Sequence, residues 1–182
     1  MKRRPAGDAA AGGGQKGGSR LIRLSDLQPQ PWQNGGGVTY EIAADPPLRP
    51  GAPVNPKDLL WRVSRAEIRQ DGPLSAFPGM TRWIVLLDGA GLTLSFAERG
   101  KLTLGETCKL EQFPGGSIAH CALLSGPCTV LNLFAHEELP MRVNLVHSRA
   151  PLPSLDHAIV SAHGVSLRLD ERHVLNAAVA VV

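Results

Sequence analysis

Two arginines, Arg62 and Arg82, are the side chains of this sequence best suited to bind a small anion. Arg62 and Ser64 alternate along one strand-like segment, and Arg82 follows a turn-rich segment. A guanidinium group can hold a carboxylate through two parallel N–H donors. The sequence therefore predicts a cationic pocket for a small carboxylate. For Arg62, an ion pair with Glu41 or Glu67 at the rim of a sheet is the alternative interpretation.

A glycine-rich segment, residues 32–41, is the second candidate for a binding function. Its three consecutive glycines, 35–37, let the backbone adopt positive φ and let another surface approach closely. Asn34, Thr39 and Glu41 place polar groups around them. No helix pattern follows and the P-loop spacing is absent, so we do not expect a nucleotide site. A tight turn that enters a strand is the alternative interpretation.

Metal ligation and covalent catalysis are not predicted by the sequence. All six histidines lie at or after His120, and no two of them have HxH or HxxxH spacing. Ser75 and Cys128 are conceivable nucleophiles, but no GxSxG motif is present and no base is assigned to either. We therefore expect no metal, no cofactor and no catalytic residue.

Short strands must position these candidate side chains. Residues 59–68 alternate so that Arg62 and Ser64 share one face and Trp61 lies on the other. Residues 82–87 and 92–96 flank a glycine-rich reversal and are predicted to form a β-hairpin. One helical turn is expected near 24–27 or 170–175. Further strands are predicted at 101–104, 109–113, 119–124, 130–134, 142–146, 158–161, 166–169 and 177–182.

Composition and charge restrict the function further. The chain has 182 residues, of which 43% are apolar and 19% charged, typical of one globular domain. The formal net charge is +3, but the first 20 residues hold five of the 19 Lys and Arg and one of the 16 Asp and Glu. The remaining 14 bases and 15 acids form no basic face, so no nucleic-acid partner is expected.

The ends of the chain and its location are also predicted. Residues 1–19 are glycine- and alanine-rich and are expected to be a disordered leader, with one folded domain over 20–182. The longest apolar run, 83–87, is too short to cross a membrane, and no membrane partner is expected. An odd number of cysteines, three, without CxxC spacing favours a reducing, cytoplasmic location. The C-terminal strand, 178–182, is expected to be a sheet edge that could pair two copies into a homodimer.

Taken together, five short motifs resemble the signature of the HutD/Ves family. They are W-x-N-G-G-G-x-T-x-E at 32–41, W-R-x-S at 61–64, S-x-F-P-G-x-x-R at 75–82, F-x-G at 113–115 and L-N at 131–132. The resemblance implies an all-β, cupin-like double barrel, two packed small β-barrels or sandwiches, without the metal-binding histidines of most cupins. It also implies a role in histidine utilisation, with an acidic ligand such as N-formylglutamate or urocanate. Residues 20–60 are expected to supply some strands of the second unit.

Carried over onto this sequence, the motifs place eleven candidate ligand-binding residues in the pocket. Arginines are expected to clamp the carboxylate, small polar side chains to donate hydrogen bonds, and aromatic side chains to form apolar walls. The candidates are Asn34, Gly36, Thr39, Glu41, Trp61, Arg62, Ser64, Ser75, Phe77, Arg82 and Asn132.

Three functions fit these residues. The first is a metal-free regulatory protein that binds a small acidic metabolite. The second is a cofactor-independent isomerase, epimerase or lyase, with Glu41 as general base and an arginine stabilising negative charge. The third is a structural or protein-interaction module with a vestigial pocket.

Overall fold

The computed structural model describes residues 19–49, 54–149, 157–161, 164–169 and 172–179. Nearly all of the leader expected at 1–19 and the last three residues of the chain lie outside these ranges. Two short 3-10 helices, η1 (Leu24–Asp26) and η2 (Pro56–Asp58), are the helices of the described residues, and the first matches the helical turn expected near 24–27. None of the described helices has the length and hydrophobicity needed to cross a membrane.

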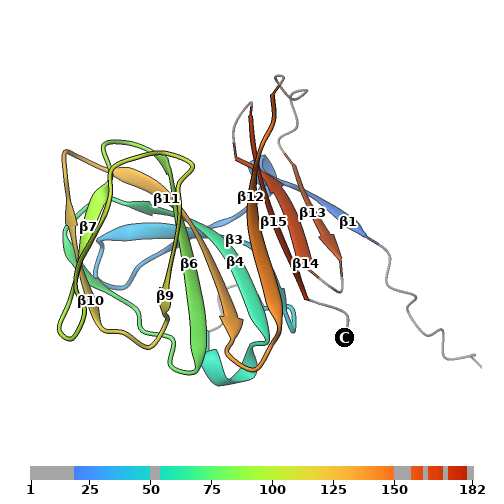
Figure 1. Ribbon diagram of the computed structural model, residues 1–182, viewed down its shortest axis with the longest axis horizontal. Helices are drawn as coiled ribbons and strands as arrows, with labels where there is room; N and C mark the ends of the chain where they lie inside the picture. The colour runs from blue at the N-terminus through green and yellow to red at the C-terminus, as the bar shows by residue number, and fades with distance from the viewer. Residues whose placement is uncertain (1–18, 50–53, 150–156, 162–163, 170–171, 180–182) are drawn as a thin grey trace, which may run out of the picture.

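All other regular elements are strands of three antiparallel sheets (Figure 1). The six-stranded sheet has the order β2 (Pro29–Pro31), β3 (Gly37–Asp45), β4 (Trp61–Ile68), β11 (Cys128–His136), β6 (Met80–Asp88) and β9 (Leu110–Pro114). The four-stranded sheet has the order β5 (Gly72–Leu74), β10 (Ala119–Leu123), β7 (Leu92–Phe96) and β8 (Gly100–Leu104). The five-stranded sheet has the order β1 (Arg20–Arg23), β13 (His157–Ser161), β14 (Gly164–Arg168), β15 (His173–Val179) and β12 (Met141–His147).

The six-stranded sheet is the central layer, and both of its faces are buried. Its inner face packs against the four-stranded sheet around residues such as Ile84, Leu94 and Val130, which form the interior of a barrel. Its outer face packs against the five-stranded sheet, and Val63 and Leu175 belong to the same core cluster between them. Figure 1 shows β7 and β10 on one side of the central strands and β12 to β15 on the other. The predicted all-β class is confirmed. Where two small barrels or sandwiches are expected, the structure has a barrel packed against a five-stranded sheet.

The predicted hairpin between residues 82–87 and 92–96 is wrong. Both segments are strands, β6 and β7, but β6 pairs with β11 and β9, whereas β7 pairs with β10 and β8 in another sheet. Gly89 and Gly91 have φ of +91° and +99°, and a Cβ on Gly91 would lie 1.8 Å from the carbonyl oxygen of Leu104. The glycines therefore form a corner that carries the chain from one sheet to the other.

The C-terminal strand is also not the sheet edge that the sequence predicts. β15 lies between β14 and β12 and pairs with both, and the edges of that sheet are β1 and β12. The residues after Val179 lie outside the described ranges. The expectation that residues 20–60 contribute strands to the second unit is confirmed, because β1 pairs with β13.

Candidate functional site

The register of the central sheet brings three polar side chains into one row inside the barrel. Glu41 on β3 lies opposite Ser64 on β4, and Ser64 lies opposite Asn132 on β11. Alternate residues of a strand face the same side, and Ala66, two residues after Ser64, belongs to the barrel core. The row therefore faces the barrel interior, and Ser64 and Asn132 are buried.

A second row lies one step along the same strands and holds both arginines. Arg62 on β4 is opposite Phe134 on β11, Phe134 is opposite Arg82 on β6, and Arg82 is opposite Phe113 on β9. All four side chains are buried. Two guanidinium groups thus alternate with two aromatic rings across the interior of the barrel.

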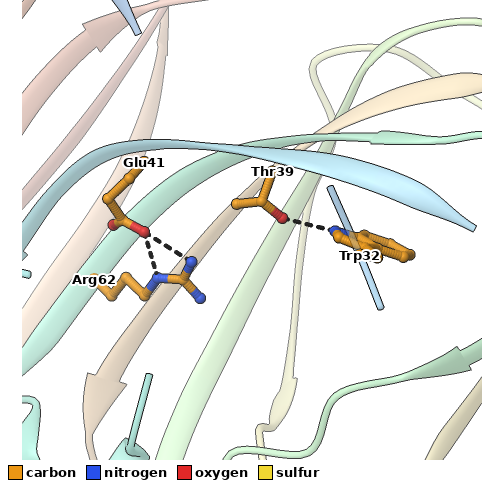
Figure 2. A network of polar contacts seen from close by, with 4 residues as sticks. All are labelled: Trp32, Thr39, Glu41 and Arg62. Carbon is orange, nitrogen blue, oxygen red and sulfur yellow. Dashed lines mark hydrogen bonds and ion pairs between the residues drawn. The ribbon is translucent and has the colours of Figure 1, made fainter. Parts of the chain in front are cut away.

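Arg62 and Glu41 form an ion pair inside the barrel (Figure 2). Nε of Arg62 donates a hydrogen bond to Oε2 of Glu41 at 2.8 Å, and Nη2 of Arg62 forms an ion pair with the same oxygen at 2.7 Å. The side chains of Arg62 and Glu41 are 9% and 17% exposed, so the pair is well shielded from water. The alternative interpretation of Arg62 as an ion-paired residue is right about the partner, but the pair lies inside the barrel and not at a rim.

The second carboxylate oxygen of Glu41 has no hydrogen-bond partner among the described residues. Oε1 is buried and makes no hydrogen bond. Burial raises the pKa of the Glu41 carboxyl, and the charge and hydrogen bond of Arg62 offset this only in part. The Glu41 carboxylate is therefore buried, with Arg62 at Oε2 and no hydrogen-bond donor from the described residues at Oε1.

Arg82 is a buried cation held by neutral groups. Its Nε and Nη2 donate to Oδ1 of Asn132 at 3.1 and 2.5 Å. Its guanidinium carbon lies 5.0 Å from the ring centre of Phe134 and 5.4 Å from that of Phe113. In the described part of the chain no carboxylate forms an ion pair with it. Burial, with a contribution from the nearby charge of Arg62, lowers the pKa of Arg82 to about 10, so the group still carries its charge at neutral pH.

Aromatic contacts join the two arginines. Phe77 stacks on Phe134 with ring centres 4.2 Å apart, and Arg62 lies over Phe77 at 5.8 Å. The sequence singled out Phe77 but not Phe134 or Phe113 as wall residues. The strand pattern contains the missing signal for Phe134, because it lies two residues after Asn132 and so shares its face.

The F-x-G motif fixes the loop that carries Phe77. Gly115 accepts a hydrogen bond from Phe77 N at 2.7 Å and donates one to Met80 O at 2.6 Å. A Cβ on Gly115 would lie 2.8 Å from Met80 O and 2.9 Å from Phe77 O, so this position requires glycine. The motif thus holds the Phe77 loop against the end of β9.

Thr39 holds Trp32 against the barrel core. Nε1 of Trp32 donates to Oγ1 of Thr39 at 2.8 Å (Figure 2). A Cβ on Gly37 would lie 2.5 Å from the backbone oxygen of Glu67 and 3.1 Å from the Trp32 ring. This glycine is therefore required by close packing.

The remaining candidates are not brought to these rows. Asn34 is exposed and its Oδ1 accepts from Gly36 N at 3.0 Å, which is the tight turn of the alternative interpretation. Gly36 is buried, and its carbonyl oxygen accepts hydrogen bonds from the backbone N–H groups of Arg69 and Gln70. Ser75 is exposed. Trp61 lies on the opposite face of β4, in the core between the central and five-stranded sheets.

The three cysteines, Cys108, Cys121 and Cys128, are buried. Burial raises the pKa of Cys121 and Cys128 to about 11. Among the residues that the structure describes, no group of three or more His, Cys, Asp or Glu could hold a metal ion.

Comparison with known proteins gives one family match and several similar structures. A family model described as HutD matches residues 24–175. HutD from Pseudomonas fluorescens SBW25 is 24% identical, with a TM-score of 0.65 over 90% of this chain and 100% of that chain. A conserved protein of unknown function from Pseudomonas aeruginosa PAO1 is 23% identical, with a TM-score of 0.64 over 89% and 93% of the two chains. These two structures share the fold of this chain.

Proposed function

This chain belongs to the HutD family, and we propose that it is a metal-free binding protein that regulates histidine utilisation by sensing N-formylglutamate, urocanate or a related acid. The proposed ligand is a small acidic metabolite, the proposed location is the cytoplasm, and nucleic acid and membranes are not proposed as partners.

The observation that carries this proposal is the buried charge of Arg82. Isolated buried charges are costly, and proteins pair them or bind a counter-ion. Arg82 has an amide oxygen and two aromatic rings as partners, none of which carries a negative charge. A ligand carboxylate would supply the missing charge. The glycine-fixed loop and the phenylalanines of the second row would give such a ligand apolar walls.

Arg62 supports the same ligand class. Glu41 neutralises part of its charge, yet two guanidinium groups and one carboxylate leave the buried rows with an excess of one positive charge. Such a site attracts a carboxylate and repels an ammonium group.

Substitution of Arg62 tests the proposal. Arg62→Ala removes the counter-ion of Glu41 and with it the excess positive charge of the site. Calorimetric titration of this variant with the acid that binds best to the parent should show a loss of affinity of about 30-fold, since an interaction with a charged group is worth on the order of 2 kcal/mol. Arg65→Ala is the matched control, because Arg65 lies on the same strand but lies over Tyr40 on the other face. Its affinity should stay within twofold. An Arg62→Ala variant that folds and binds like the parent would exclude this site.

A cofactor-independent isomerase, epimerase or lyase is the second candidate function. It is favoured by the raised pKa and the unpaired Oε1 of Glu41, since a carboxylate with these properties can accept a proton from a bound acid. NMR of candidate acids incubated with the protein would detect turnover, and Glu41→Gln should abolish it. Unchanged spectra for a panel of acids that bind the protein would exclude turnover of these acids and would favour the regulatory function.

A further inference from the structure

We propose that the ligand of this site carries a hydrogen-bond donor as well as a carboxylate, with the carboxylate on Arg82 and an N–H or O–H group donating to Oε1 of Glu41. This inference rests on the proposed function. The inference goes further than the proposed function because it assigns a second ligand group, a hydrogen-bond donor, and names Glu41 as the residue that binds this donor.

The first observation is the unused oxygen of Glu41. Figure 2 shows that the two contacts between Arg62 and Glu41, from Nε and from Nη2, reach a single oxygen, Oε2. Oε1 is buried, and no described residue donates to it. Buried polar atoms of native proteins almost always have a partner, and an ionised acceptor is the most costly to leave without one. An N–H or O–H group on the ligand would supply the missing hydrogen bond to Oε1.

The second observation is the unused part of Arg82. Asn132 takes up Nε and Nη2, and Nη1 makes no hydrogen bond with any residue that the structure describes. Arg82 is therefore held in place and still has donors for an acceptor from outside the chain. The two incomplete groups have opposite requirements, an acceptor at Arg82 and a donor at Glu41.

The strand order sets the size and polarity of a ligand that meets both groups. Glu41 is on β3 and Arg82 on β6, with β4 and β11 between them. Neighbouring strands lie about 4.8 Å apart, so the two backbones are separated by three such steps, about 14 Å along the sheet. Ser64 and Asn132 face the barrel interior in this interval. An acid with a single functional group reaches only Arg82, and a second carboxylate placed near Glu41 would be repelled.

Matched ligands that differ only in the donor test this proposal. One pair is urocanate and 3-(oxazol-4-yl)acrylate, in which a ring oxygen replaces the N–H of the imidazole and the other ring nitrogen is kept. The other is N-formyl-L-glutamate and 2-formyloxyglutarate, in which an ester oxygen replaces the amide N–H. Each compound is titrated calorimetrically into the parent protein at pH 7.5. We expect the donor-bearing member to bind at least tenfold more tightly in the pair that binds.

Two variants assign the preference to Glu41. Glu41→Gln can present an amide N–H at the position of Oε1, so the preference should fall to threefold or less, or reverse. Glu67→Gln is the control, because Glu67 pairs with Arg65 and Arg69 and its side chain is 29% exposed. This variant should keep the preference of the parent. Thermal unfolding checks that both variants fold, and the ligand pairs in the parent protein remain a test if Glu41→Gln does not.

The outcomes separate this inference from the proposed function. Equal binding of both members of a pair, or tighter binding of the member without a donor, would overturn the inference and leave acid sensing intact. A preference that survives in a folded Glu41→Gln variant would also overturn it. Absence of binding by all four acids would refute the proposed function, and this inference with it.

Discussion

Replacing Arg82 and its partner with apolar side chains should make the protein more stable and unable to bind acids. Burial lowers the pKa of Arg82 from its ordinary value to about 10 in the folded protein, which corresponds to a cost of about 3 kcal/mol for its charged form. Two cation–π contacts, each worth about 1 kcal/mol, offset part of this cost. Removing both members of a buried hydrogen bond is nearly neutral. Arg82→Met with Asn132→Leu should therefore raise the free energy of unfolding by about 1 kcal/mol.

The single substitution Arg82→Met is the informative control. It leaves Oδ1 of Asn132 buried with no donor, a cost of about 1–3 kcal/mol, so this variant should be less stable than the double variant. Urea unfolding with and without a saturating acid measures both effects. The acid should stabilise the parent protein but neither variant. A double variant that loses more than about 2 kcal/mol would show that Arg82 holds the fold together, and would refute its assignment as an uncompensated charge.

Three further predictions concern the core, a glycine and the thiols. Trp61→Leu should lower the free energy of unfolding by about 2 kcal/mol in urea and leave acid affinity within twofold, because Trp61 packs between the sheets; a tenfold loss of affinity would contradict this. Gly37→Ala should cost more than about 2 kcal/mol, since its Cβ would lie 2.5 Å from a backbone oxygen, while Gly105→Ala, whose Cβ meets one side-chain atom at 3.7 Å, should cost under about 1 kcal/mol; equal losses would contradict the packing argument. Cys121 and Cys128, with pKa values raised to about 11, should react with a thiol reagent at pH 8 only after unfolding, and rapid labelling of the folded protein would count against their burial.

Side-chain alternation was the most informative feature of the sequence for the site. The pattern of residues 59–68 put Arg62 and Ser64 on one face of a strand, and the structure has them there, in the barrel. The same pattern placed Trp61 on the opposite face, so its proposed role as a pocket wall conflicted with its own strand. Its position between two sheets follows from the alternation.

Pairing between strands could not be read from local pattern. The segments that became β6 and β7 have the alternation and the glycine-rich turn of a hairpin, but a turn that joins two sheets has the same composition. The position of β15 depends on β14 and β12, which are likewise defined only by the folded sheet.

The family motifs identified candidate residues but not the direction in which each side chain points. Asn34 and Ser75 belong to the matching motifs, yet both are exposed in the structure, and Asn34 caps its own turn. Phe113 and Phe134 reach Arg82 because β9 and β11 flank β6, a long-range arrangement that no local spacing reveals. That no described carboxylate forms an ion pair with Arg82 is likewise a property of the folded register.

Calorimetric titration of the metal-stripped protein with N-formyl-L-glutamate, urocanate and glutamate tests the central claim most directly. The excess positive charge of Arg62 and Arg82 over Glu41 attracts a carboxylate and disfavours a free ammonium group. We therefore expect saturable binding of one of the first two acids, in preference to glutamate. Absence of binding by all three, or equal binding of glutamate, would contradict the proposed sensor of an acidic intermediate.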